Sequence, residues 1–138
     1  MKQKLRRSSI AFVSVISSFA WNIILLVAVV LDLNFAHTRA SGGQFTNFPF
    51  AIRFIYLLQL FLVIYQVWVF KRIFHAKPLK VKWTPKFFLI LGIIGIFLNA
   101  ASRSANERWN VIPAAIITFA FWNYGVRKKS PGKSGNPS

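Results

Sequence analysis

Four long apolar stretches alternate with shorter polar and basic segments along the chain. They are predicted to form helices over residues 10–31, 49–70, 85–102 and 105–124. At a rise of about 1.5 Å per residue, the first of these helices extends about 33 Å, which is enough to cross a hydrocarbon layer about 30 Å thick. The last two stretches form an antiparallel hairpin because only a brief turn separates them. The pattern predicts an all-α integral membrane protein, a four-transmembrane-helix bundle over residues 10–124.

Capping residues mark where three of these helices begin. Pro49 is typical of the first turn of a helix, and Thr84 followed by Pro85 reads as an N-cap and a first helical position. Ser104 and Glu107 match the S-x-x-E capping box, in which each side chain bonds the amide of the other residue. The fourth helix therefore begins at about residue 105.

Two further features predict the local shape of the last two helices. Gly92 and Gly95 favour a close approach of another helix to the third span. Pro113 removes an intrahelical hydrogen bond in the ninth position of the fourth helix, and we expect a kink there.

A secretory signal peptide is the alternative interpretation of the first apolar stretch, because the basic segment 1–9 precedes it. Signal peptides, however, have apolar cores of up to about 15 residues, which is shorter than this stretch. The nearest small-x-small cleavage pattern, at residues 38–40, lies beyond a polar segment. A retained anchor helix is favoured.

The distribution of Lys and Arg predicts how the bundle is threaded. The chain has 18 Lys and Arg residues, and most of them fall in segment 1–9, in the linker 71–82 together with Lys86, and in the tail 125–138. With four spans, these three segments lie on one side of the membrane, and the positive-inside rule makes that side cytoplasmic. Four aromatic residues fall near the same boundary, as an interfacial belt does: Trp68, Trp83, Trp122 and Tyr124. We expect a multi-pass cell-membrane protein with both termini in the cytoplasm and a disordered basic tail.

The net charge of +16 also bears on the partners of the protein. A soluble domain this basic is typical of nucleic-acid binding, but 55% of the residues are apolar and the mean hydropathy is +0.49. Each Lys or Arg near an anionic leaflet gains about 1 kcal/mol. The basic segments are therefore expected to contact anionic lipid headgroups on the cytoplasmic side, with no nucleic-acid partner.

The residue types that carry most enzyme chemistry are scarce. The sequence has no cysteine, two histidines and two acidic residues, Asp32 and Glu107, far apart along the chain. No catalytic, metal-binding or cofactor-binding site is predicted from them. A membrane-embedded enzyme acting on lipids or quinones is the weakest of the three functional classes considered.

Polar residues are expected to gather at the outer end of the bundle. The candidate outer polar cluster consists of Asp32, Arg53, Asn99, Arg103, Asn106, Glu107 and Arg108. Asp32 and Arg53 are predicted to pair and to join the first two helices, the alternatives being simple snorkelling of the arginine or a substrate or proton site. A helix continuing to Arg103 would place Gly95, Asn99 and Arg103 on one face. The segment is either a capped hairpin turn or a binding surface.

A second set of polar residues is expected inside the membrane. Tyr56, Gln59 and Gln66 lie within about 80° of one another around the second helix and form a polar stripe. A similar set on the first helix consists of Ser14, Ser18 and Asn22. Such residues usually hold membrane helices together. A polar permeation path and oligomer contacts are the alternatives.

These features favour a small membrane protein without catalytic chemistry, an accessory, stabilising or regulatory subunit of a membrane assembly. Its partner would be another membrane protein or a second copy of the chain. The alternative is an oligomeric small transporter or channel. The chain resembles four-helix drug exporters in size and number of spans, but their coupling depends on a membrane-embedded carboxylate, and the two acidic residues here lie at helix ends.

Overall fold

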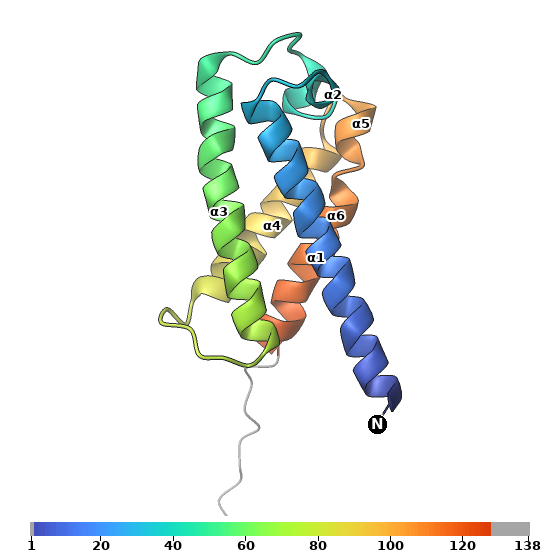
Figure 1. The fold of residues 1–138 in the computed structure, drawn as a ribbon, viewed down its shortest axis with the longest axis vertical. Coiled ribbons are helices and arrows are strands. Elements are labelled where there is room, and N and C mark those ends of the chain that lie inside the picture. The colour runs from blue at the N-terminus through green and yellow to red at the C-terminus, as the bar shows by residue number, and fades with distance from the viewer. Residues whose placement is uncertain (1, 128–138) are drawn as a thin grey trace, which may run out of the picture.

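The described part of the chain is mostly helical. The computed structural model describes residues 2–127, with side chains from residue 8 onward, and contains no strand within that range. Its α-helices are α1 (Lys2–Val30), α2 (Asn34–His37), α3 (Phe50–Phe74), α4 (Thr84–Ala100), α5 (Ala105–Arg108) and α6 (Val111–Ala120). A 3-10 turn, η1 (Ser41–Gly43), and a π-helical segment, η2 (Phe121–Val126), complete the fold (Figure 1).

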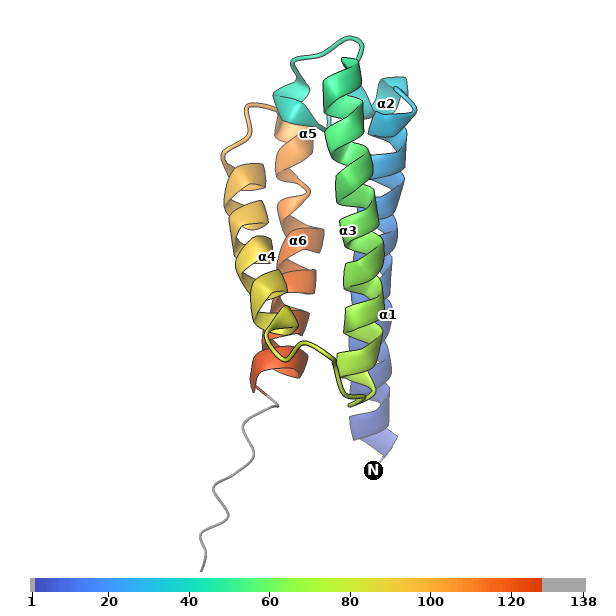
Figure 2. The same cartoon turned by 90° about the vertical axis from the view of Figure 1, so that its left-hand side faces the viewer.

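The long helices run up and down in one bundle (Figures 1 and 2). Helix α1 packs along α3 and α6, and α4 packs along α6 and η2. Helices α3 and α4 contact each other only sparsely. Figure 2 shows α6 behind the space between them. The bundle therefore consists of two helix pairs, α1–α3 and α4–α6, joined where α1 meets α6.

Two of these helices have the length and composition of a membrane span. An 18-residue window has a mean hydropathy of 2.3 within Ser8–Val30 and of 1.8 within Phe50–Phe74. Helix α4 is apolar but shorter, and its 17 residues extend about 26 Å. Helix α3 runs four residues beyond its predicted end at residue 70. Its last turn carries Lys71 and Arg72, whose positive charges interact favourably with the negative end of the helix dipole. The Arg72 guanidinium also lies 5.1 Å from the centre of the Trp68 ring.

The predicted helix starts differ from the structure at three places. Helix α1 begins at Lys2, so most of the segment 1–9, expected to precede the first helix, is part of it. The next two starts differ by one residue. Pro49 precedes α3, and its carbonyl accepts a hydrogen bond from the amide of Arg53 at 3.1 Å. The N-cap of α4 is Trp83, so Thr84 is the first helical residue and the prediction that it caps the helix was wrong. Pro85 lies in the first turn, but as the second helical residue and not as the predicted first.

The predicted fourth helix is broken near its start. A turn at residues 109–110 separates α5 from α6, so the expected continuous helix over 105–124 was wrong. Pro113 has no N–H to donate, and the carbonyl of Trp109 instead accepts from the amide of Ile112 at 3.2 Å. Pro113 therefore lies in the first turn of α6 and does not kink the middle of a longer helix.

The main core lies where all four long helices meet. Four phenylalanines there are fully buried: Phe19, Phe70, Phe88 and Phe121. A smaller cluster forms where the loop after α1 folds back, and it includes Val29, Ala36 and Phe48. The outward surface carries large apolar side chains, and only 6% of the most apolar 18-residue window of α3 is buried, against 39% for α1.

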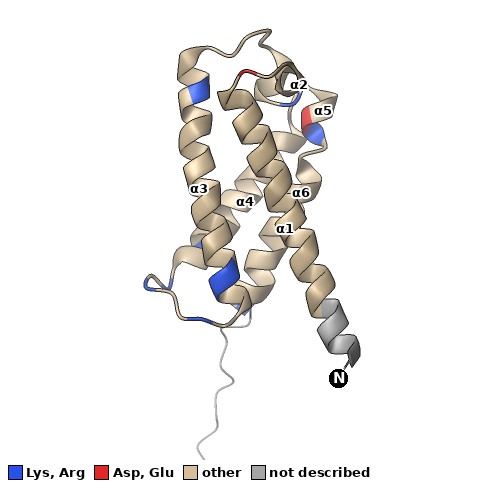
Figure 3. Ribbon diagram, viewed as in Figure 1, with Lys and Arg blue, Asp and Glu red and all other residues tan. Residues whose placement is uncertain are grey.

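The charged residues of the described region lie at the two ends of the bundle (Figure 3). The basic end carries Lys71, Arg72, Lys77, Lys80, Lys82, Lys86 and Arg127. The mixed-charge end carries Asp32, Arg39, Arg53, Arg103, Glu107 and Arg108. The charges of segments 1–7 and 128–138, including the predicted disordered tail, lie outside the described side chains. The tail itself was expected from residue 125, but η2 continues the helix to Val126.

Candidate functional site

A cavity of about 320 Å³ lies between α3 and α4, with α1 and α6 at its back. The predicted polar stripe of Tyr56, Gln59 and Gln66 lines it, because the spacing of these residues turns all three toward the same side of α3. Leu98 also lines the cavity and is 69% exposed, and Gln59 is exposed as well. The mouth of the cavity therefore opens between α3 and α4.

Three side-chain amides that line this cavity have no hydrogen-bond partner among the described residues: Asn22, Gln59 and Gln66. Gln66 is the most enclosed, at 9% exposed. Every fully enclosed side-chain nitrogen or oxygen in the described region has a partner, so the amide of Gln66 must reach the open space of the cavity. Gln59 and Gln66 therefore do not hold helices together by hydrogen bonds, the role expected of the stripe, whereas its third member, Tyr56, shares a hydrogen bond with the Ser41 hydroxyl at 3.3 Å.

Two other polar side chains in the cavity wall are satisfied within their own helices. The Asn99 side-chain nitrogen donates to the Gly95 carbonyl at 2.8 Å, and the Thr118 hydroxyl donates to the Ala114 carbonyl at 2.6 Å. Because α4 ends at Ala100, Arg103 does not continue the helical face of Gly95 and Asn99, and that prediction was wrong. Ser18 likewise bonds within α1, to the carbonyl of Ser14.

The two glycines of α4 play different roles. A Cβ atom on Gly92 would lie 2.2 Å from the Thr118 hydroxyl oxygen, so only glycine allows α4 and α6 to approach as they do. A Cβ atom on Gly95 would meet nothing within 4 Å, because this residue faces the cavity. The predicted close-approach face is therefore confirmed for Gly92 and wrong for Gly95.

Asn110 lines the cavity and joins three segments there. Its side-chain oxygen accepts from the indole nitrogen of Trp21 at 3.0 Å, and its side-chain nitrogen donates to the Arg39 carbonyl at 3.2 Å. The Arg39 guanidinium also lies 5.7 Å from the Trp21 ring. Asn110 is buried and was missing from the predicted cluster. The only sequence signal for it was an amide directly before the apolar run of α6.

Glu107 lines the same end of the cavity and ties two turns together. Its carboxylate accepts from the Gly42 amide at 2.7 Å and from the Ser102 hydroxyl at 2.5 Å. The Ser104 hydroxyl accepts from the Glu107 amide at 3.4 Å, as the capping box predicts. The Ser104 amide, however, donates to the Ser102 hydroxyl and not to the Glu107 carboxylate. The reciprocal half of the box is absent because the Glu107 carboxylate is used by the loop after α1.

We expect Glu107→Ala to detach that loop from the turn before α5. The substitution leaves the Gly42 amide and the Ser102 hydroxyl without their acceptor, at a cost of about 1–3 kcal/mol. Limited proteolysis should then cleave within residues 38–46 faster than in the parent protein. Glu107→Gln retains an acceptor oxygen and should show an intermediate rate. Equal rates for all three proteins would contradict this role.

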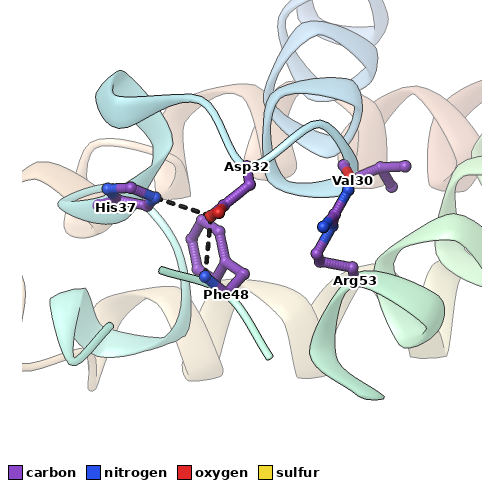
Figure 4. Close-up of polar contacts among 5 residues, drawn as sticks. All are labelled: Val30, Asp32, His37, Phe48 and Arg53. Carbon is purple, nitrogen blue, oxygen red and sulfur yellow. Dashed lines mark hydrogen bonds and ion pairs between the residues drawn. The ribbon is translucent and has the colours of Figure 1, made fainter. Parts of the chain in front are cut away.

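Asp32 and Arg53 do not form the predicted ion pair (Figure 4). The Asp32 carboxylate accepts from the His37 imidazole at 2.9 Å and from the Phe48 amide at 2.8 Å. Arg53 instead donates to the Val30 carbonyl at 2.7 Å, at the C-terminus of α1. Arg53 therefore still joins the first two long helices, through the last carbonyl of α1, whereas Asp32 holds the loop between them.

The surroundings of Asp32 predict a pH dependence of stability. The Phe48 amide and the His37 imidazole hold the pKa of this carboxyl below its ordinary value of 3.8. Because the folded pKa is the lower one, the stabilisation is complete above pH 3.8 and is lost as the pH falls through the folded pKa. Asp32→Asn removes this titration and tolerates the positive φ of 57° at this position.

Thermal unfolding should therefore show a steeper acid-induced loss of stability for the parent protein than for Asp32→Asn below pH 3.8. His37→Ala removes one donor to the carboxylate and should give a slope between the two. Parallel pH profiles for the parent protein and Asp32→Asn would show that the carboxylate does not hold the loop.

The seven residues of the predicted outer cluster therefore do not form one cluster. Asn99 and Glu107 line the cavity, whereas Arg103, Asn106 and Arg108 are exposed at the mixed-charge end. Within the described region, no group of three or more His, Cys, Asp or Glu side chains could hold a metal ion.

No protein-family model, curated protein or solved structure matches the chain. Chemically, the cavity offers neutral hydrogen-bond donors and acceptors within apolar walls.

Proposed function

We propose that this chain is a four-span integral membrane protein, with α5, α6 and η2 together forming the fourth span and the basic end in the cytoplasm. The support is the distribution of side chains. Charges occupy the two ends of the described bundle, and large apolar side chains cover its outward surface. The basic end would contact anionic headgroups, and both termini would lie on that side.

Within the membrane, the protein acts as a non-catalytic accessory subunit that stabilises or regulates a partner membrane protein. The observation that carries this proposal is a row of exposed side chains along α3. The row consists of Phe54, Leu58, Phe61, Tyr65 and Trp68. Their alternating spacing of four and three residues is the spacing that places side chains along a helix–helix seam. The occupant of the seam would be a membrane helix of another protein.

A photoreactive amino acid at position 61, in the native membrane, tests this proposal. We expect one crosslinked product whose mass exceeds that of the chain by a fixed amount, from a single partner protein. The matched control is position 97 on α4, where Phe97 is 70% exposed but lies outside the row. Loss of the product in Leu58→Ala would assign it to the seam. Equal crosslinking from both positions, or none from position 61, would contradict the proposal.

The cavity favours a second candidate, an oligomeric small transporter or channel. Polar groups along a span provide the lining that a permeation path requires. Crosslinking from position 61 to a second copy of the chain, together with solute flux in vesicles of the purified protein, would support this candidate. Crosslinking to a different protein and no flux would support the accessory role.

A further inference from the structure

We propose that the cavity between α3 and α4 binds a neutral lipid that carries both an ester carbonyl and a free hydroxyl group, as a monoacylglycerol does. The polar group would lie among the amides of Asn22, Gln59 and Gln66, and the acyl chain would leave through the mouth of the cavity into the bilayer. This inference rests on the proposed membrane location but not on the accessory role.

The first argument is the state of Gln66. Its side chain is more than nine-tenths buried, its amide reaches the cavity, and it has no hydrogen-bond partner among the described residues. An enclosed amide without a protein partner is free to bind another molecule. A bound molecule with its own donors and acceptors would satisfy it. Asn22 and Gln59 add two further amides in the same wall.

The second argument concerns the charge of the ligand. The two charged residues that line the cavity, Arg39 and Glu107, are already engaged. Glu107 accepts from Gly42 and Ser102, and the Arg39 guanidinium lies over the Trp21 ring. A charged headgroup would therefore enter without a free counter-charge, whereas side-chain amides both donate to a carbonyl and accept from a hydroxyl.

The third argument concerns size and access. A cavity of about 320 Å³ is at the small end of ligand sites and can take a glycerol headgroup, though not a whole lipid. Apolar side chains also line the cavity, among them Leu62, Leu91 and the exposed Leu98. The opening between α3 and α4 lets an acyl chain remain among the lipid tails. Gly95 leaves room in the wall, since a Cβ atom there would meet nothing within 4 Å.

The test uses the full-length protein in phosphatidylcholine nanodiscs and a monoacylglycerol with a diazirine in its acyl chain. Mass spectrometry should place the label on residues lining the cavity mouth, and unlabelled monoolein should compete with it. Oleate and oleylamine, which have the same chain and a charged headgroup, should compete poorly. Label spread over the outer surface, or equal competition by all three lipids, would overturn the proposal.

Two variants locate the binding groups. Gln66→Leu keeps a similar volume without the amide, and we expect about tenfold weaker monoolein competition. Gly95→Leu fills the cavity and should abolish cavity labelling. Unchanged labelling in both variants would overturn the proposal.

Stability and partner contact separate this proposal from a structural role of Gln66. Without lipid ligand, Gln66→Leu should unfold at the same or a higher temperature, because a partnerless amide has been removed. A marked fall in unfolding temperature would assign Gln66 to structure and overturn the binding role. Crosslinking from position 61 should be unaffected by either variant, so failure of the lipid site and failure of the accessory role are distinguishable.

Discussion

Phe121→Ala is expected to lower the free energy of unfolding by about 3 kcal/mol, which is the largest effect of any substitution considered. Phe121 is 0% exposed and lies at the junction of α6 and η2. Its ring centroid is 5.4 Å from that of Phe88 and 6.4 Å from that of Phe70. Removing the ring leaves a void among helices that cannot close it without losing other contacts. Denaturant titration in detergent micelles measures the effect.

The matched control is Phe119→Ala. Phe119 lies two residues earlier and is 60% exposed, so its ring faces lipid in the proposed membrane location. We expect a change below about 1 kcal/mol, because exposed positions away from special contacts contribute little. Similar losses for the two variants would show that the helices do not pack through Phe121.

The second large effect is expected at the contact between α4 and α6. Gly92→Ala places a methyl group 2.2 Å from the buried Thr118 hydroxyl oxygen, and separating the helices to accommodate it should cost about 2 kcal/mol. Gly95→Ala, one turn later, meets nothing within 4 Å. It should leave stability unchanged or raise it by up to about 1 kcal/mol, because alanine favours helix over glycine.

A double substitution checks the cause of the Gly92 effect. Thr118→Ala removes Oγ1 and Cγ2, which would lie 2.2 and 3.3 Å from a Cβ atom on residue 92. The double variant Gly92→Ala/Thr118→Ala should therefore recover most of the stability lost by Gly92→Ala alone. Strict additivity of the two single losses would mean that these residues do not touch.

The features that follow from helical periodicity were predictable from the sequence. The apolar stretches predicted the end of α1 and both ends of α3 to within four residues, because a long apolar run has few alternatives to a helix, but α1 begins eight residues before its predicted start. The spacing of Tyr56, Gln59 and Gln66 predicted a shared face. That this face lines a cavity depends on how far α3 stands from α4, and sequence spacing carries no information on that distance.

The features that depend on contacts between distant segments were not predictable. The pairing of Asp32 with Arg53 was predicted only because both residues were expected at a similar depth in the membrane. The loop after α1 instead supplies donors from His37 and Phe48. The break before α6 similarly depends on Asn110, whose partner Trp21 lies 89 residues away in the sequence. From the sequence alone, Pro113 is equally compatible with a kink within a long helix and with the first turn of a new helix.

Single-cysteine labelling on intact cells tests the membrane placement most directly, since the chain contains no native cysteine. Lys80→Cys places a thiol in the loop at the basic end, and Gln44→Cys places one in the loop at the mixed-charge end; both positions are exposed. A membrane-impermeant maleimide should label Gln44→Cys on intact cells and Lys80→Cys only after the membrane is opened. Labelling of Lys80→Cys on intact cells, or recovery of either protein in the soluble fraction, would contradict the account.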